Sequence, residues 1–121
     1  MVSPNTAAEV AAPTLEAGRF LVLGALTCSE IVEARRLGAD LVKVYPLPPV
    51  GGPAYLEVVR QPLGDIPMLA AGAFGIDDIP AYRDKGAVAF GIGAPLLGAD
   101  DTETLERIGR ALAMARGEVS A

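Results

Sequence analysis

The sequence predicts an α/β protein in which short parallel strands alternate with helices. Four apolar runs recur along the chain, at residues 20–23, 41–45, 68–71 and 87–90. Nearly continuous apolar runs of this kind are typical of parallel strands that are covered on both faces. The composition suits close packing of helices on a sheet, because 51% of the 121 residues are hydrophobic and 14 are glycine.

Helical segments are expected between the apolar runs. Gly38 and Gly86 each precede an apolar run and are typical of residues that end a helix. Pro80 suits the first turn of a helix that begins at Asp77 or Asp78. The expected helices cover residues 7–17, 29–37, 55–60, 77–86 and 102–116.

The strand count limits the architecture. Residues 1–4 predict a fifth strand, and the last helix is amphipathic, with Leu105, Ile108 and Leu112 on one face. A closed (β/α)8 barrel needs eight strands and typically about 250 residues, or about 200 at the low end. The chain is therefore expected to be either an open α/β sheet or a piece of such a barrel.

Charge and hydropathy exclude two classes of partner. The net charge is -5 and the 10 basic residues are scattered, whereas binding to nucleic acid needs clustered Lys and Arg. No apolar run reaches the ~18 residues that span a bilayer, and the N-terminus has no secretory signal. We expect a cytoplasmic protein with one domain over residues 1–117 and a frayed tail over residues 118–121.

Cys28 is the only cysteine, and histidine is absent. A disulfide within the chain, a Ser-His-Asp triad, a Cys-His pair and a zinc site built on histidine are therefore excluded. Cys28 is expected to be a small packing residue, because no base is near it in the sequence. Thr27 or Ser29 is expected to cap the following helix, with a substrate contact as the alternative.

Lys43 is unusual because it lies within the apolar run 41–45, near its carboxyl end. A lysine that is buried without a partner tends to lower its pKa and become a neutral amine. A neutral amine can attack a ketone and form a Schiff base. The alternative is a lysine at an exposed sheet edge, or one whose stem reaches solvent. Lys85, the other lysine, is expected at a solvated helix end.

Two glycine-rich turns follow the third and fourth apolar runs. Gly72 and Gly75 follow one run, and Gly91 and Gly93 follow the next. Turns of this kind bring backbone N–H groups and a helix N-terminus onto an anion. Neither turn matches a P-loop or a dinucleotide-binding motif. An anion site is one hypothesis, and tight turns without a ligand are the other.

Several segments of the chain occur in the order found in one enzyme family. The segments are Val2-Ser3-Pro4-Asn5 and residues 23–30, 38–46, 51–56 and 86–93. They include a Val-Lys-x-(Phe/Tyr)-Pro pattern followed by Gly-Gly-x-x-x-Leu. Over roughly residues 1–98 the chain resembles the C-terminal part of the 2-keto-3-deoxy-6-phosphogluconate (KDPG) and 2-keto-4-hydroxyglutarate (KHG) aldolases, class I pyruvate lyases of carbohydrate metabolism.

The resemblance implies a (β/α)8 barrel, usually a trimer, of which this chain supplies about strands four to eight. It implies that Lys43 forms a Schiff base with the keto acid and that no metal or cofactor is needed. The substrate would be a 2-keto-3-deoxy-phospho-sugar acid or 4-hydroxy-2-oxoglutarate, which is split into pyruvate and an aldehyde. The implied substrate or phosphate contacts are Gly72, Ala73, Phe74, Gly91, Ile92, Gly93 and Ala94.

The chain also departs from the family pattern. Ala71 stands where the family has a threonine, Ala94 where it has a serine, and Leu23 where it has a proline. The turn after Lys43 reads Pro-Leu-Pro instead of Pro-Ala-Glu. The family's general-base glutamate and carboxylate-binding arginine come from strand two, which these residues do not include.

Three hypotheses follow from the sequence. The first is a class I aldolase, or the C-terminal piece of one, with Lys43 as nucleophile. The second is a non-catalytic half-barrel that binds a small anion or pairs with a complementing chain. The third is an open-sheet phosphate-binding domain unrelated to aldolases, in which Lys43 is incidental. The family resemblance favours a homo-oligomer for the first.

Overall fold

The computed structural model describes residues 1–119 and has a sheet of four parallel strands. Each strand pairs with the next one along the chain, in the order β1-β2-β3-β4. A helix connects each pair of neighbours, as parallel pairing requires. The strands are β1 (Val22–Ala25), β2 (Leu41–Val44), β3 (Met68–Ala71) and β4 (Ala89–Gly91). The α/β class and the parallel sheet are therefore confirmed.

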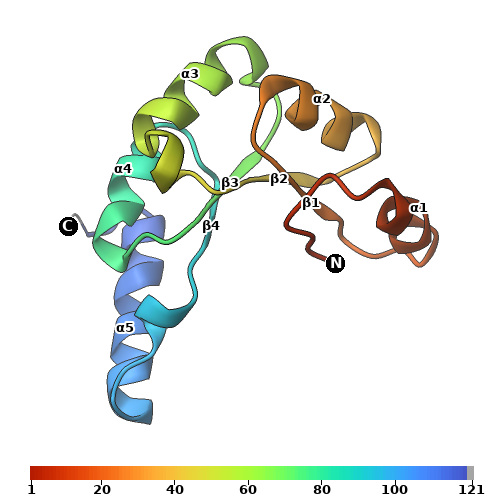
Figure 1. Ribbon diagram of the computed structural model, residues 1–121. Helices are drawn as coiled ribbons and strands as arrows, with labels where there is room; N and C mark the ends of the chain where they lie inside the picture. The colour runs from red at the N-terminus through yellow and green to blue at the C-terminus, as the bar shows by residue number, and fades with distance from the viewer. Residues whose placement is uncertain (120–121) are drawn as a thin grey trace.

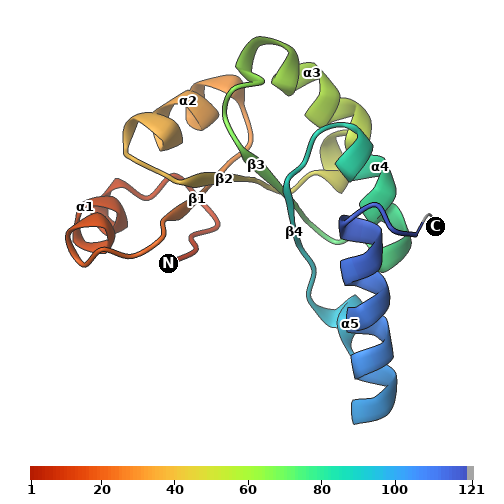
Figure 2. The ribbon, with the colours of Figure 1, turned by 180° about the vertical axis from the view of Figure 1, so that it is seen from behind.

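Five helices form an arc around one side of this sheet (Figures 1 and 2). Helices α2 and α3 lie over the middle of the sheet, and α1 and α5 lie at the two ends of the arc (Figure 1). Within residues 1–119, none of them is both long and apolar enough to cross a membrane. The helices are α1 (Ala8–Glu16), α2 (Cys28–Arg36), α3 (Pro53–Leu63), α4 (Ile79–Asp84) and α5 (Asp101–Ala115).

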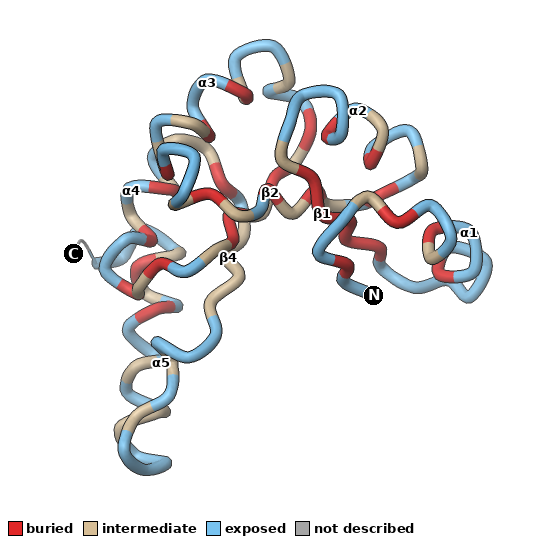
Figure 3. Tube along the Cα trace, viewed as in Figure 1, coloured by how far each residue is buried: buried red, intermediate tan, exposed pale blue. Residues whose placement is uncertain are grey.

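The core lies between the sheet and the helices. On β2, Val42 and Val44 are fully buried, whereas Leu41 and Lys43 are partly exposed. Because neighbouring side chains of a strand point to opposite faces, one face of β2 is covered by helices and the other is open. Figure 3 shows that the buried residues follow the strands and the helix sides that face them.

The predicted N-terminal strand is present as a single parallel bridge between Val2 and Val22. The Val22 N–H donates to the Met1 carbonyl, and the Ser3 N–H donates to the Val22 carbonyl, both at 2.9 Å. A Cβ on Gly24 would overlap the backbone of Pro4. Glycine at that position therefore allows the N-terminal segment to lie against β1.

Two strands begin later than the sequence predicts. The N–H of Leu21 donates to the Asp40 carboxylate at 2.8 Å, and β1 begins one residue further on. The N–H of Ala87 donates to the Tyr82 carbonyl at 3.1 Å and completes the end of α4, so β4 begins at Ala89. At Leu21 the acceptor comes from the connection that leads into β2, and at Ala87 it comes from the end of α4. In each place this bond takes the N–H group that the predicted strand would have used.

The helices agree closely with the predicted ranges, with one difference in burial. The helix predicted from Asp77 or Asp78 is divided into a 3-10 turn, Ile76–Asp78, and α4. In α5 the buried residues are Ala111 and Met114, whereas the apolar stripe of Leu105, Ile108 and Leu112 is exposed. The predicted tail, 118–121, falls partly on residues 120–121, which lie outside the described residues.

Candidate functional site

The carboxyl ends of β2, β3 and β4 meet around a hollow of about 530 Å³. This position follows from the parallel sheet, because turns after neighbouring strands emerge at the same edge. The hollow is lined by Tyr45, Gly72, Ala73, Phe74, Gly75, Gly93, Ala94 and Pro95. Three segments that are far apart in the sequence therefore contribute to one site.

Lys43 lies on the open face of β2. It is not among the residues that line the hollow, but Tyr45, two residues further on, is. Lys43 is in register with Gly24 on β1 and Leu69 on β3. Its Nζ atom lies over the ring of Tyr45, 4.6 Å from the ring centroid. Lys43 and Tyr45 share a face because alternate residues of a strand point the same way. Within residues 1–119, Lys43 forms no hydrogen bond or ion pair with another side chain.

Lys43 is therefore less enclosed than the apolar run around it suggests. It is only partly exposed, and the buried positions of the strand are its neighbours Val42 and Val44. The sequence places an amine in a strand, but alternation turns that amine away from the core. Its surroundings are the open face of the sheet and the aromatic ring of Tyr45.

The turn after β3 is held in a conformation that requires glycine. Gly72 has φ of 147°, and a Cβ there would overlap the ring of Pro48. The Leu47 N–H donates to the Ala71 carbonyl at 3.1 Å. The turn that follows β2 is thus fastened to the end of β3, which brings Tyr45 and Gly72 to the same hollow.

The hollow carries little positive charge. Its lining has no Lys or Arg, and the phenol of Tyr45 is the one polar side chain among the lining residues. The Gly75 N–H donates to the Asp78 carboxylate at 2.8 Å, so this amide is already occupied. Within residues 1–119, the N–H groups of Ala73 and Gly93 make no hydrogen bond to another backbone group. They are among the amides that remain available to an anion.

Beneath the turn after β3, two aromatic rings pack together. The ring centroids of Phe74 and Tyr82 are 4.4 Å apart. Burial raises the pKa of the Tyr82 phenol, and the nearby Asp78 carboxylate raises it further. Tyr82 is therefore neutral and serves to support the turn that carries Phe74.

The structure brings together most of the residues that the resemblance implicates. Gly72, Ala73, Phe74, Gly93 and Ala94 all line the hollow. Gly75, which belongs to one of the predicted glycine-rich turns, lines it too, and so do Tyr45 and Pro95, which the sequence did not point to. The alternation of strand residues could have identified Tyr45, because it lies two positions after Lys43.

Two implicated residues lie elsewhere. Gly91 pairs with Ala71 on β3, and a Cβ on Gly91 would lie 3.2 Å from the Ala71 Cβ. Ile92 lines a different hollow, between β4 and α5. Their assignment as substrate contacts stays a prediction.

The segment around Cys28 has a structural role in starting α2. Thr27 and Glu30 form a capping box, in which the Thr27 N–H donates to Glu30 at 3.0 Å and the Glu30 N–H donates to Thr27 at 3.4 Å. The expected Thr27 cap is confirmed. The expectation that Cys28 is a small packing residue is wrong, because Cys28 is exposed in the first turn of α2.

Comparisons with known proteins give the class of this fold. A solved structure described as native KDPGal matches 96% of this chain and 57% of its own, with a TM-score of 0.86 and 25% identity. A solved 4-hydroxy-2-oxoglutarate aldolase/2-deydro-3-deoxyphosphogluconate aldolase from TTHB1 matches 94% of this chain and 57% of its own, with a TM-score of 0.85 and 27% identity. The fold is therefore that of aldolases of this type.

The family assignment follows from the sequence comparison. The KDPG and KHG aldolase family model matches residues 1–111, and the chain belongs to this family. Among curated proteins, the 2-dehydro-3-deoxy-6-phosphogalactonate aldolase of Escherichia coli (strain K12) is 28% identical over 97 residues. That match covers 79% of this chain and 47% of the relative. The chain thus spans about half the length of the curated relative that it matches.

Proposed function

We propose that this chain carries the Schiff-base half of a class I aldolase site, with Lys43 as the nucleophile. The observation that supports this proposal most strongly is the position of Lys43. It is the one lysine on the sheet, at the carboxyl end of β2 and beside a hollow formed by three turns. Parallel sheets bind ligands at this end of their strands. Membership of the aldolase family agrees with this role.

The proposed reaction begins when the Nζ atom of Lys43 attacks the keto carbon of the substrate. Loss of water gives an imine. Once the imine nitrogen is protonated, a general base takes the proton of the fourth-carbon hydroxyl. The electron pair of the bond between the third and fourth carbon atoms then moves toward the imine, which releases an aldehyde and an enamine. Protonation of the enamine and hydrolysis of the resulting imine release pyruvate and regenerate Lys43.

The substrate would be 4-hydroxy-2-oxoglutarate or a 2-keto-3-deoxy-phospho-sugar acid. The lining of the hollow favours 4-hydroxy-2-oxoglutarate, because its distal carboxylate carries less negative charge than a phosphate. A phosphate there would depend on backbone amides such as those of Ala73 and Gly93, and the Asp78 carboxylate would repel it. The contacts assigned by resemblance, including Gly91, Ile92 and Ala94, belong to this proposal.

The fold proposal is that residues 1–117 correspond to about strands four to eight of a (β/α)8 barrel. The four-stranded parallel sheet, the bridge at Val2 and the 57% coverage of a solved relative support this correspondence. A homo-oligomer is proposed as well, since one solved neighbour is a cage designed by fusing symmetric oligomeric domains. A cytoplasmic location remains a prediction.

A non-catalytic half-barrel is the second candidate. Within residues 1–119, no carboxylate lines the hollow, so the phenol of Tyr45 is the one lining side chain that can serve as an acid or base at the pyruvate methyl carbon. Ala71 and Ala94 also replace the hydroxyl side chains that the family resemblance leads one to expect. In this case the chain would bind a small anion or pair with another chain without turnover.

Trapping with pyruvate and borohydride tests the proposal, because reduction makes the imine permanent and mass spectrometry locates it. We expect an adduct at Lys43 that disappears in Lys43→Arg. Lys85→Arg is the matched control, because Lys85 pairs with Glu57 at 2.9 Å away from the hollow. An intact protein with no adduct at Lys43 would contradict the proposed chemistry. An adduct without cleavage of the keto acids would favour the second candidate.

A further inference from the structure

One aromatic ring lies directly beside the proposed nucleophile. The Nζ atom of Lys43 lies over the face of the Tyr45 ring, 4.6 Å from the ring centroid. A cation over the face of an aromatic ring is attracted by the negative charge of the π-electrons, up to a distance of about 6 Å. The Lys43 nitrogen is therefore close enough for a cation–π contact.

The neighbouring strands give the Lys43 nitrogen no comparable partner. Leu69 on β3 is in register with Lys43, and one step further toward the carboxyl ends Ala71 on β3 pairs with Gly91 on β4. Paired residues of parallel strands lie on the same face of a sheet, so this side of the lysine has only small or apolar neighbours. Within residues 1–119, Lys43 also takes part in none of the ion pairs. The ring of Tyr45 is thus the contact that can hold its charge.

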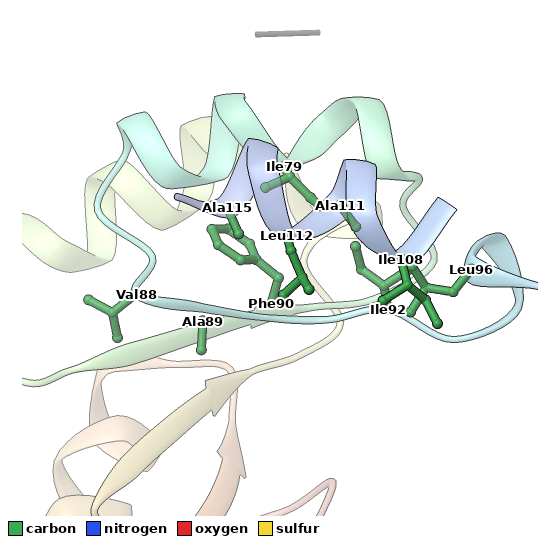
Figure 4. A pocket seen from close by; sticks show the side chains of 10 residues that line it. All are labelled: Ile79, Val88, Ala89, Phe90, Ile92, Leu96, Ile108, Ala111, Leu112 and Ala115. Carbon is green, nitrogen blue, oxygen red and sulfur yellow. The ribbon is translucent and has the colours of Figure 1, made fainter. Parts of the chain in front are cut away.

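The other aromatic rings of the chain have different neighbours. Among three phenylalanines and three tyrosines, only Tyr45 and Phe74 line the hollow. The Phe74 ring packs against Tyr82, with the two centroids 4.4 Å apart. Phe90 points toward α5, on the helix side of β4 (Figure 4). Tyr45 is therefore the aromatic residue that both contacts Lys43 and borders the hollow.

This double contact connects the Lys43 nitrogen to the hollow. Tyr45 is among the residues that line the hollow of about 530 Å³, whereas Lys43 is not. The flexible stem of a lysine can place its nitrogen in many positions, and fixing one of them costs side-chain entropy. Attraction to the ring offsets part of that cost and keeps the nitrogen at the border of the hollow.

We propose that Tyr45 is a positioning residue for Lys43, and that its ring holds the nitrogen beside the hollow before the attack on a keto acid and after it. A lysine nitrogen is positively charged as an ammonium and again as a protonated imine, and a ring face attracts both cations. Only the amine that attacks between these two states is uncharged. The role after the attack rests on the proposed Schiff-base function, whereas the contact of the ammonium can be measured without substrate.

The contact is tested first in the protein without pyruvate. Reductive methylation gives each lysine methyl groups with an NMR signal and leaves its positive charge in place. Lys43→Arg and Lys85→Arg assign the signals of the two lysines. We expect the Lys43 methyl signal upfield of the Lys85 signal, because it lies over a ring, and nuclear Overhauser contacts with the Tyr45 ring protons. Lys85 is the internal control, since it pairs with Glu57. Absence of both signatures at Lys43 would overturn the proposal.

Two variants then separate the ring of Tyr45 from its hydroxyl. Tyr45→Phe keeps the ring and should keep the upfield shift of the Lys43 methyl signal, whereas Tyr45→Leu removes the ring and should lose the shift. Phe20→Leu is the matched control, because the Phe20 ring is 61% exposed and lines a different hollow, beside α1. Circular dichroism checks that each variant folds. A shift that persists in Tyr45→Leu would overturn the proposal.

Borohydride trapping with limiting pyruvate tests the role in the reaction. The adduct at Lys43 should form about two- to fivefold more slowly in Tyr45→Leu than in Tyr45→Phe, which is the factor expected for one cation–π contact at an exposed ring. Equally slow trapping in both variants would overturn the proposal, because the hydroxyl and not the ring would then be needed. Trapping at the unchanged rate in both would overturn it as well.

The two measurements separate this proposal from the proposed function. An adduct at Lys43 without the NMR signatures of the ring would leave the Schiff-base chemistry standing and remove the role of Tyr45. The ring signatures without any adduct in the unsubstituted protein would contradict the Schiff-base function and support the contact between Tyr45 and the Lys43 ammonium.

Discussion

The two halves of this molecule bury their apolar residues to different extents. Under α2 and α3, Ile31 and Leu56 are fully buried against the sheet. At the far end, α5 buries only Ala111 and Met114 and leaves Leu105 68% exposed. The apolar side chains of α2 and α3 that face the sheet are covered, whereas the apolar stripe of α5 is left exposed within the described residues. The difference shows that an amphipathic pattern predicts that one face of a helix is buried, but does not identify the segment that covers it.

The two halves should differ most in how much stability is lost when an apolar side chain is shortened to alanine. Leu56→Ala on α3 should lower the free energy of unfolding by about 2–5 kcal/mol, because it leaves a cavity in a closed core. Leu112→Ala on α5 should change it by less than about 0.5 kcal/mol, because its side chain is half in solvent. Urea unfolding monitored by circular dichroism measures both. Equal losses would mean that the α5 stripe is already covered in the isolated chain.

The turns after β3 and β4 offer the next comparison. Gly72→Ala should cost about 1–3 kcal/mol, because a side chain at φ of 147° is strained and meets Pro48. Gly93→Ala should be nearly neutral, since its φ is -109° and no atom lies within 4 Å of the position of a Cβ. Thermal unfolding of the two variants tests this. A large loss in Gly93→Ala would show that the β4 turn is as confined as the β3 turn.

Helix caps should matter differently in the two halves. Thr27→Ala removes the capping box of α2 and should cost about 1 kcal/mol of global stability. Asp100→Ala removes the acceptor of the Glu103 N–H, 2.8 Å away, at the start of α5. Because α5 is less covered, we expect this loss as faster hydrogen exchange in its first turn and little change in global unfolding. Ser29→Ala, beside the cap, is the control and should change neither quantity.

The smallest expected effect is a dependence on acid pH. The N–H of Thr27 and then its hydroxyl lower the pKa of the Glu30 carboxyl in the folded state. Its stabilising contribution is therefore complete above the unfolded pKa of about 4.3 and is lost as the pH falls through the folded pKa. Glu30→Gln should flatten the acid side of the stability curve slightly. An unchanged curve would show that this exposed carboxylate contributes nothing measurable.

Much of the fold could be predicted from local patterns. The apolar runs predict the strands, and the glycines that end helices predict where the helices stop. Both signals depend only on residues that are neighbours in the sequence, so the elements are predicted in the right order. The site was harder to predict. Gly72 and Gly93 were found as turns, but the path of the chain decided that they meet Tyr45 in one hollow. Ile92 lies in the same turn as Gly93 in the sequence, but its side chain packs beside α5 instead.

By itself, the sequence determined that this is a parallel α/β chain with an amine in its second strand and glycine turns after the next two. These properties follow from periodicity and from the chemistry of single residues. Only the tertiary structure decided that Lys43 faces the open side of the sheet and that the α5 stripe has no cover within residues 1–119. Both depend on contacts between segments far apart in the chain, and a pattern in one segment cannot state where its partner lies.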